Sequence, residues 1–194
     1  MYCGVTLIST KMKKIVLMFV LLAGIASTPA IAKPYISGSV GLGMPGDWDE
    51  VEHHEKFDSS AAWNGAIGYS FGSYRLEAAL GYENPNYKND SSADASILTV
   101  MANGYYDIDT NSKITPYLMA GAGIADINVS WWTANSSTSF VWQVGAGVGL
   151  KGNDHVTFDL GYRYIRPEGL ECPEDHSNVS WSSHHIMAGV RYQF

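Results

Sequence analysis

Histidine and serine residues near the C-terminus could support nucleophilic catalysis. His176 is followed by Ser177, and Ser183 is followed by His184. A serine nucleophile needs a histidine within hydrogen-bond reach, and that histidine needs a carboxylate to orient it. Neighbouring residues of an extended segment point to opposite faces, so Ser183 is poorly placed to serve His184. We therefore expect no catalytic residues and no enzymatic activity.

A second set of candidate residues could bind a divalent cation, because carboxylate and imidazole groups are common metal ligands. Six acids surround the pair His53-His54: Asp47, Asp49, Glu50, Glu52, Glu55 and Asp58. Their spacing matches no closed metal site, and solvated acidic loops commonly have this composition. The sequence therefore predicts neither a bound metal nor a cofactor.

A third set of charged residues occurs at alternate positions among apolar residues. Four of them are acids and four are bases, and charges that leave water must be paired. This balance predicts an ion-paired network inside the protein. The eight residues are Arg75, Glu77, Glu83, Asp107, Lys151, Asp159, Arg163 and Arg191.

Strands must position these charges, because apolar and polar residues alternate along most of the chain. At the C-terminus, for example, Ile186 and Val190 share one face while Arg191 lies on the other. Each strand is about as long as a tilted strand that crosses a bilayer. The predicted strands cover residues 35–44, 61–72, 74–83, 96–107, 116–125, 139–151, 155–165 and 184–194.

The apolar faces of these strands carry no Asp, Glu, Lys or Arg. A lipid-facing Arg or Lys near the midplane costs ~2–4 kcal/mol, so this pattern is typical of a membrane barrel. A soluble ligand-binding barrel would instead turn its apolar faces inward. We predict an all-β, eight-stranded antiparallel up-and-down transmembrane β-barrel. Its lumen is plugged by side chains, with inward glycines leaving room for Tyr105, Tyr117 and Arg163.

The connections between the predicted strands alternate in length. Short links lie around residues 72–73, 107–115 and 152–154. Longer polar segments cover approximately residues 45–60, 84–95, 126–138 and 166–180. Outer-membrane barrels have short periplasmic turns and long external loops. We therefore expect the N- and C-termini of the barrel to lie in the periplasm.

Residues 1–32 are typical of a secretory signal peptide, with Met12 as an alternative start. Lys13 and Lys14 precede a short apolar run, and Ala30-Ile31-Ala32 forms a small-x-small cleavage pattern. Residues 33–194 then form a single barrel domain. That domain keeps 9 basic residues against 19 acidic ones, which argues against nucleic acid as a partner. It keeps only Cys172, so no intrachain disulfide can form.

Three segments resemble strands five, six and seven of small opacity-type surface antigens: Lys113 to Ile124, Phe140 to Gly149 and Val156 to Tyr164. The resemblance covers residues 33–194 and extends to the superfamily of OmpA-type barrels and porin-family proteins. It implies a surface-exposed protein of the Gram-negative outer membrane, in contact with outer-membrane lipid and lipopolysaccharide. The last strand, which carries Tyr192 and ends on Phe194, resembles the assembly signal that the barrel-assembly machinery recognises.

Members of such families serve as adhesins, antigens, minor pores or envelope stabilisers, so function is expected in the loops. We predict a surface antigen, an adhesin-like protein or an envelope structural protein that contacts host surface molecules. Trp131 and Trp132 are candidate contact residues, because exposed paired aromatics are costly without a partner. The alternative is that both belong to the outer aromatic girdle. A narrow porin-like channel and a lipid A-modifying enzyme remain alternative functions.

Overall fold

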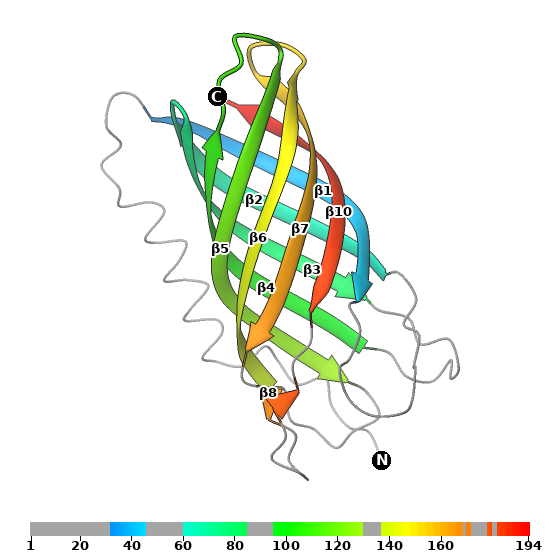
Figure 1. Cartoon of the computed structure of the whole chain (residues 1–194). Coiled ribbons are helices and arrows are strands. Elements are labelled where there is room, and N and C mark those ends of the chain that lie inside the picture. The colour runs from blue at the N-terminus through cyan, green and yellow to red at the C-terminus, as the bar shows by residue number, and fades with distance from the viewer. Residues whose placement is uncertain are drawn as a thin grey trace.

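Eight antiparallel strands close into one barrel in the computed structural model (Figure 1). The structure describes residues 32–45, 60–84, 95–129, 137–168, 170–171, 178–179 and 182–194. The barrel strands are β1 Lys33–Pro45, β2 Ser60–Phe71, β3 Tyr74–Asn84, β4 Ala95–Asp107, β5 Ile114–Val129, β6 Ser137–Lys151, β7 Val156–Glu168 and β10 Ser183–Gln193. This closed sheet confirms the predicted fold class. Across the described residues, no helix has the length and apolar character needed to span a membrane.

The barrel closes where β1 pairs with β10, in the strand order β1-β10-β7-β6-β5-β4-β3-β2. The register of this seam runs from the pair Tyr35 and Gln193 to the pair Pro45 and Ser183. Every other pairing joins two barrel strands that are consecutive in the sequence, as an up-and-down topology requires.

The structure extends several strands beyond their predicted ends. Strand β5 ends at Val129 instead of residue 125, and β7 ends at Glu168 instead of residue 165. Strand β6 begins at Ser137 instead of residue 139, so Ile127 pairs with Ser137. A two-residue strand, β8 Leu170–Glu171, also pairs with β9 Asn178–Val179 inside the segment predicted as a loop. The apolar alternation marks only the part of a strand that faces lipid, whereas backbone pairing continues beyond it. Alternation therefore underestimates strand length.

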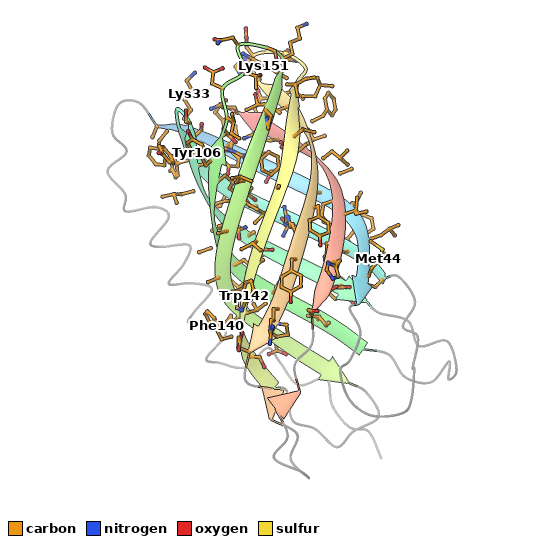
Figure 2. The ribbon with its side chains drawn as sticks, in the orientation of Figure 1. Lys33, Met44, Tyr106, Phe140, Trp142 and Lys151 are labelled. Atoms are coloured by element: carbon orange, nitrogen blue, oxygen red, sulfur yellow. The ribbon has the colours of Figure 1, made fainter. Side chains whose placement is uncertain are left out.

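The apolar faces point outward, as the sequence predicts (Figure 2). Leu160 and Val40 are 54% and 47% exposed, whereas Met101 and Met187, on the opposite faces of their strands, are 4% exposed. A soluble barrel would bury the first pair and expose the polar faces. The apolar outer surface is therefore the arrangement expected of a barrel surrounded by hydrocarbon.

The two ends of the barrel differ. Three short connections lie at one end, which we call the turn end: residues 72–73, 108–113 and 152–155. The first is a tight turn in which Gly72 has a φ of +69°, a conformation that favours glycine. The amide of Phe194 donates to the carbonyl of Pro34 at the same end, 3.1 Å away. We call the opposite end, where the labelled Met44 and Phe140 lie in Figure 2, the loop end.

A charge at the centre of the outer face tests this placement. Val144 is the middle residue of β6 and is 43% exposed. We expect Val144→Arg to lower the free energy of unfolding in phospholipid vesicles by ~2–4 kcal/mol, measured by urea titration. Val144→Ala, which removes the side chain without adding charge, is the control. Equal losses for the two variants would contradict a position in hydrocarbon.

Candidate functional site in the barrel lumen

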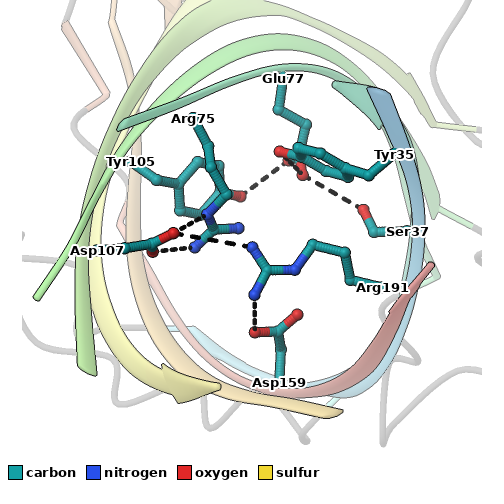
Figure 3. Close-up of polar contacts among 8 residues, drawn as sticks. All are labelled: Tyr35, Ser37, Arg75, Glu77, Tyr105, Asp107, Asp159 and Arg191. Carbon is teal, nitrogen blue, oxygen red and sulfur yellow. Dashed lines mark hydrogen bonds and ion pairs between the residues drawn. The ribbon is translucent and has the colours of Figure 1, made fainter. Parts of the chain in front are cut away.

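A chain of ion pairs crosses the lumen near the turn end (Figure 3). Arg75 on β3 donates from Nε and Nη2 to the two carboxylate oxygens of Asp107 on β4, each at 2.8 Å. Arg191 Nη1 lies 3.9 Å from Asp107 Oδ2, and Arg191 Nη2 lies 3.4 Å from Asp159 Oδ1. The chain thus connects β3, β4, β10 and β7 and contains four of the eight charged residues predicted for the lumen.

Two tyrosines enclose the guanidinium of Arg75. Its Cζ lies 4.2 Å from the ring centroid of Tyr105 and 5.2 Å from that of Tyr117, within cation–π range. Glycines on the facing strands give Tyr117 its space, because a Cβ at Gly147 or Gly161 would lie 2.4 or 2.5 Å from its hydroxyl oxygen. The inward glycines therefore make room for Tyr117, as the sequence predicts.

Glu77 lies beside this chain but is stabilised by hydrogen bonds instead of an ion pair. Its carboxylate accepts hydrogen bonds from Tyr105 at 2.8 Å, Asn103 at 3.1 Å, Tyr35 at 3.2 Å and Ser37 at 3.3 Å. Figure 3 shows the tyrosines and Ser37 directed at this group. Charge-assisted hydrogen bonds can offset the cost of burying a carboxylate. Glu77 is therefore a hydrogen-bonded centre of the lumen.

A second polar cluster lies nearer the loop end. Ser60 donates to Glu83 Oε1, and Glu83 Oε2 lies 3.4 Å from His185 Nε2. The same Nε2 lies 2.9 Å from Ser183 Oγ. A Cβ at Gly43 would lie 2.3 Å from Glu83 Oε1, so the glycine lets the carboxylate cross the inner face of β1. This cluster joins β2 and β3 to β10 at the seam where the barrel closes.

This cluster contains serine, histidine and glutamate but lacks the geometry of a catalytic triad. A triad histidine uses one ring nitrogen for the serine and the other for the carboxylate. In this cluster a single nitrogen, His185 Nε2, contacts both groups. His184 lies on the outer face, where its Nδ1 contacts the hydroxyl of Tyr162. Sequence reasoning missed the pair Ser183 and His185, although the spacing of two residues places both on one strand face.

Two of the predicted lumen residues stand apart from both clusters. Lys151 was expected inside, but this prediction is wrong: its side chain is 56% exposed, and its Nζ lies 3.4 Å from Asp154 Oδ1. Lys151 ends β6 at the turn end, where a long side chain reaches solvent. Arg163 faces the lumen between the two clusters, because it lines one cavity with His185 and another with Glu77 and Asp159.

An apolar layer separates the polar clusters, and sequence reasoning missed it. Its residues lie on the inward strand faces, among glycines and charged residues. The alternation pattern therefore marked these faces as polar, and the apolar residues on them were not recognised as a core. Packing of apolar side chains across the lumen excludes water without needing a partner for each atom. The layer consists of Ala66, Ala79, Ile97, Met101, Ala125 and Val141, with Ile165 packed against them.

Several predicted residues lie outside the described part of the chain. They are Trp131, Trp132, His53, His54, Cys172, His176, Ser177 and the signal segment up to residue 31. Within the described residues, no group of three or more His, Cys, Asp or Glu side chains could hold a metal ion. The proposed metal ligands around His53 and His54 are among the residues that the structure does not describe.

The predicted assembly signal lies on the outer face at the turn end. Tyr192 and Phe194 are 41% and 64% exposed, and their rings meet edge to face with centroids 5.2 Å apart. Tyr192 also stacks on the ring of His155, at 5.8 Å. Both aromatic side chains are therefore accessible from outside the barrel. Their role in assembly stays a prediction.

The ion-pair chain predicts a large difference between two Asp→Asn substitutions. Asp107→Asn leaves the buried guanidinium of Arg75 without its carboxylate, and we expect it to lower the free energy of unfolding by about 3–5 kcal/mol. Asp154→Asn breaks only the exposed pair with Lys151, which is worth about 0–1 kcal/mol. Urea unfolding in lipid vesicles measures both values. Similar losses would show that Arg75 does not depend on Asp107.

Comparison with known proteins identifies relatives of this barrel. The model of the family described as outer membrane protein beta-barrel domain matches residues 15–194. The outer membrane protein PagN of Salmonella typhimurium is 27% identical over 117 residues, which cover 50% of this chain and 49% of PagN. The chain thus matches about half the length of that relative.

Two solved structures have the same fold. Neisserial surface protein A superimposes with a TM-score of 0.65 at 22% identity, over 84% of this chain and 99% of that protein. Ail, the attachment invasion locus protein of Yersinia pestis, was solved with the heparin analogue sucrose octasulfate. It gives a TM-score of 0.54 at 16% identity, over 84% of this chain and 99% of Ail. With its closed barrel and apolar outer face, the chain belongs to the outer membrane protein beta-barrel domain family.

Proposed function

We propose that this outer-membrane barrel is an adhesin-like surface protein that contacts host surface molecules through its loops and keeps its lumen closed. The observation that carries the proposal is the lumen itself. Arg75, Asp107, Arg191 and Asp159 reach across it, and a buried apolar layer lies behind them. A barrel filled in this way leaves recognition to the segments outside it.

The orientation of the barrel is part of this proposal. The turn end, with the first residue of β1 and the last of β10, faces the periplasm, and the loop end faces the exterior. The unequal connection lengths support it, because outer-membrane barrels place short turns inside and long loops outside. In this orientation the aromatic and histidine side chains of Trp142, Tyr164 and His184 face the outer leaflet and its lipopolysaccharide.

Charge indicates what kind of partner the loops would accept. Ail was solved with a sulfated heparin analogue, which is a polyanion. Residues 46–59 of this chain contain six acids and one lysine, and the chain as a whole has a net charge of −7. Like charges across an interface repel each other. We therefore propose a neutral or basic host surface molecule as the partner of this protein.

Replacing loops tests the adhesive role. We expect bacteria whose barrel carries Gly/Ser linkers at residues 130–136 and 172–177 to lose adherence to cultured host cells, because the proposed contact surface is gone. An equally sized replacement at residues 108–113 of the turn end is the control and should keep adherence. Heat-modifiable electrophoretic mobility verifies that each barrel folds. Unchanged adherence of the folded loop variant would exclude these loops as the contact surface.

We do not propose an enzymatic role for the polar cluster at the loop end. A lipid A-modifying enzyme would need a serine that reaches substrate, whereas Ser183 and Ser60 are fully buried. His185 offers the same ring nitrogen to Ser183 and to Glu83. This arrangement favours a structural role for the cluster at the seam.

Assembly by the barrel-assembly machinery forms the second part of the proposal. Deletion of Phe194 should lower the amount of protein inserted in the outer membrane, because it removes the exposed terminal aromatic. Phe158→Ala is the matched control, since Phe158 is 51% exposed on the outer face of neighbouring β7. Membrane fractionation with immunodetection measures both variants. If the deletion inserts as well as Phe158→Ala does, the terminal ring is not a signal.

A further inference from the structure

Two glycines on the outer face are not explained by packing inside the barrel. Gly38 on β1 and Gly65 on β2 pair directly with each other across the two strands. Inward glycines such as Gly147 make room for side chains of the lumen, whereas a Cβ added at Gly38 or Gly65 would meet no atom within 4 Å. Neither residue has a positive φ, so the backbone does not require glycine there. The two glycines instead leave a low point in the lipid-facing surface.

This low point is part of a hollow of about 390 Å³ on the outer face of β1 to β4, which we call the outer hollow. Its volume lies within the range of roughly 300–1,000 Å³ that is typical of ligand sites. Large exposed side chains stand around the glycines, and Leu98 on β4 lies at the far side. The outward residues that line the outer hollow with Gly38, Gly65 and Leu98 are Val40, Trp63, Leu80 and Tyr82.

The medium around the barrel limits what can occupy the outer hollow. Its lining, which lies within the described residues, contains no Asp, Glu, Lys or Arg and is continuous with the apolar outer face. An empty hollow would leave these apolar groups without contacts on one side. The outer hollow reaches across four adjacent strands, and three spacings of ~4.8 Å give a length of about 14 Å. One leaflet of the hydrocarbon core is ~15 Å thick, so a single acyl chain has the matching length.

The position of the outer hollow along the barrel indicates which leaflet supplies this chain. Gly65 lies in the middle of β2, and Trp63 lies closer to the loop end, next to Tyr82 on β3. Tryptophan and tyrosine favour the level of the lipid headgroups, because their rings are apolar and their N–H or O–H groups are polar. In the proposed orientation the loop end faces the exterior, so this side of the barrel contacts lipopolysaccharide in the outer leaflet.

A second copy of the barrel would fit the outer hollow less well than an acyl chain. The outer wall of a closed barrel is convex, so a partner barrel would touch the exposed side chains of Trp63 and Leu80 before it reached the glycines. A flexible chain one methylene wide can lie between these side chains and contact the backbone of Gly38 and Gly65 directly.

We propose that the outer hollow binds one acyl chain of lipid A, an inference that rests on the proposed orientation of the barrel. The chain lies against Gly38 and Gly65, and its ester end lies beside Trp63 and Tyr82. This site adds a lipid-binding function to the surface role proposed above. It requires neither the loops nor an open lumen.

Native mass spectrometry of barrels purified from outer membranes in mild detergent tests the proposal. The unmodified barrel should retain one molecule of lipid A. Gly65→Leu fills the outer hollow without a clash, because the added Cβ has open space, so the fraction of barrels with bound lipid A should fall several-fold. Gly65→Ala fills less of the space and should cause a smaller loss.

Gly104→Leu is the matched control, because Gly104 is an outer-face glycine of β4 outside the lining of the outer hollow. A Cβ there would meet only the carbonyl oxygen of Ala120, at 3.9 Å, so this variant should keep its lipid A. Heat-modifiable mobility verifies that each variant is folded. Equal retention in Gly65→Leu and Gly104→Leu overturns the acyl site but not the adhesive role, which the loop replacements test separately.

Two other results would overturn the proposal in different ways. A bound phospholipid in place of lipid A, lost only in Gly65→Leu, would contradict both the lipid A site and the outward position of the loop end. Loss of a dimer in Gly65→Leu, with no change in bound lipid, would overturn the acyl chain in favour of a second copy of the barrel.

Discussion

The rest of this structure depends on one constraint: in hydrocarbon, every backbone N–H and C=O group must find a partner within the protein. A sheet satisfies it only by closing, since any open edge would expose a row of unpaired groups. Closure occurs between the first and last strands, β1 and β10, whose register runs without interruption from Tyr35 to Pro45. Side chains reinforce the same seam, because Glu83 crosses the inner face of β1 over Gly43 to reach His185 on β10. The seam therefore holds through both backbone and side-chain contacts.

Closure with eight strands also determines what the interior must be. The enclosed space is only wide enough for side chains, and the alternation that turns apolar residues toward lipid turns the polar faces inward. The inward-facing side chains fill this narrow interior in layers. Carboxylates and guanidinium groups pair near the turn end, apolar residues such as Val141 pack in the middle, and Glu83 with His185 occupies the loop end. Within the described part of the chain, the lumen is therefore filled by side chains of the barrel strands themselves.

The sequence was sufficient to predict the fold but not the contacts across the lumen. Alternation fixes which face a residue occupies, and it placed residues such as Leu160 outside and Arg75 inside correctly. It carries no information on how strongly the strands tilt, and tilt decides which inward residues share a level. The bridge of Arg191 between Asp107 and Asp159 could therefore not be foreseen from spacing. Lys151 fails for another reason: at a strand end the inward face no longer has a wall opposite it.

Local pattern and global fold agree in the barrel, because each unusual residue has a physical explanation. The exposed apolar residues are explained by lipid, the buried acids by arginines or hydroxyl donors, and the inward glycines by the rings they accommodate. Arg163 fits the same account, because it lines one cavity together with Glu77 and Asp159. Arg75, Arg163 and Arg191 thus face Asp107, Asp159 and Glu77 near the turn end, so positive and negative charges are equal in number. This balance lowers the cost in free energy of placing charged groups inside a barrel that hydrocarbon surrounds.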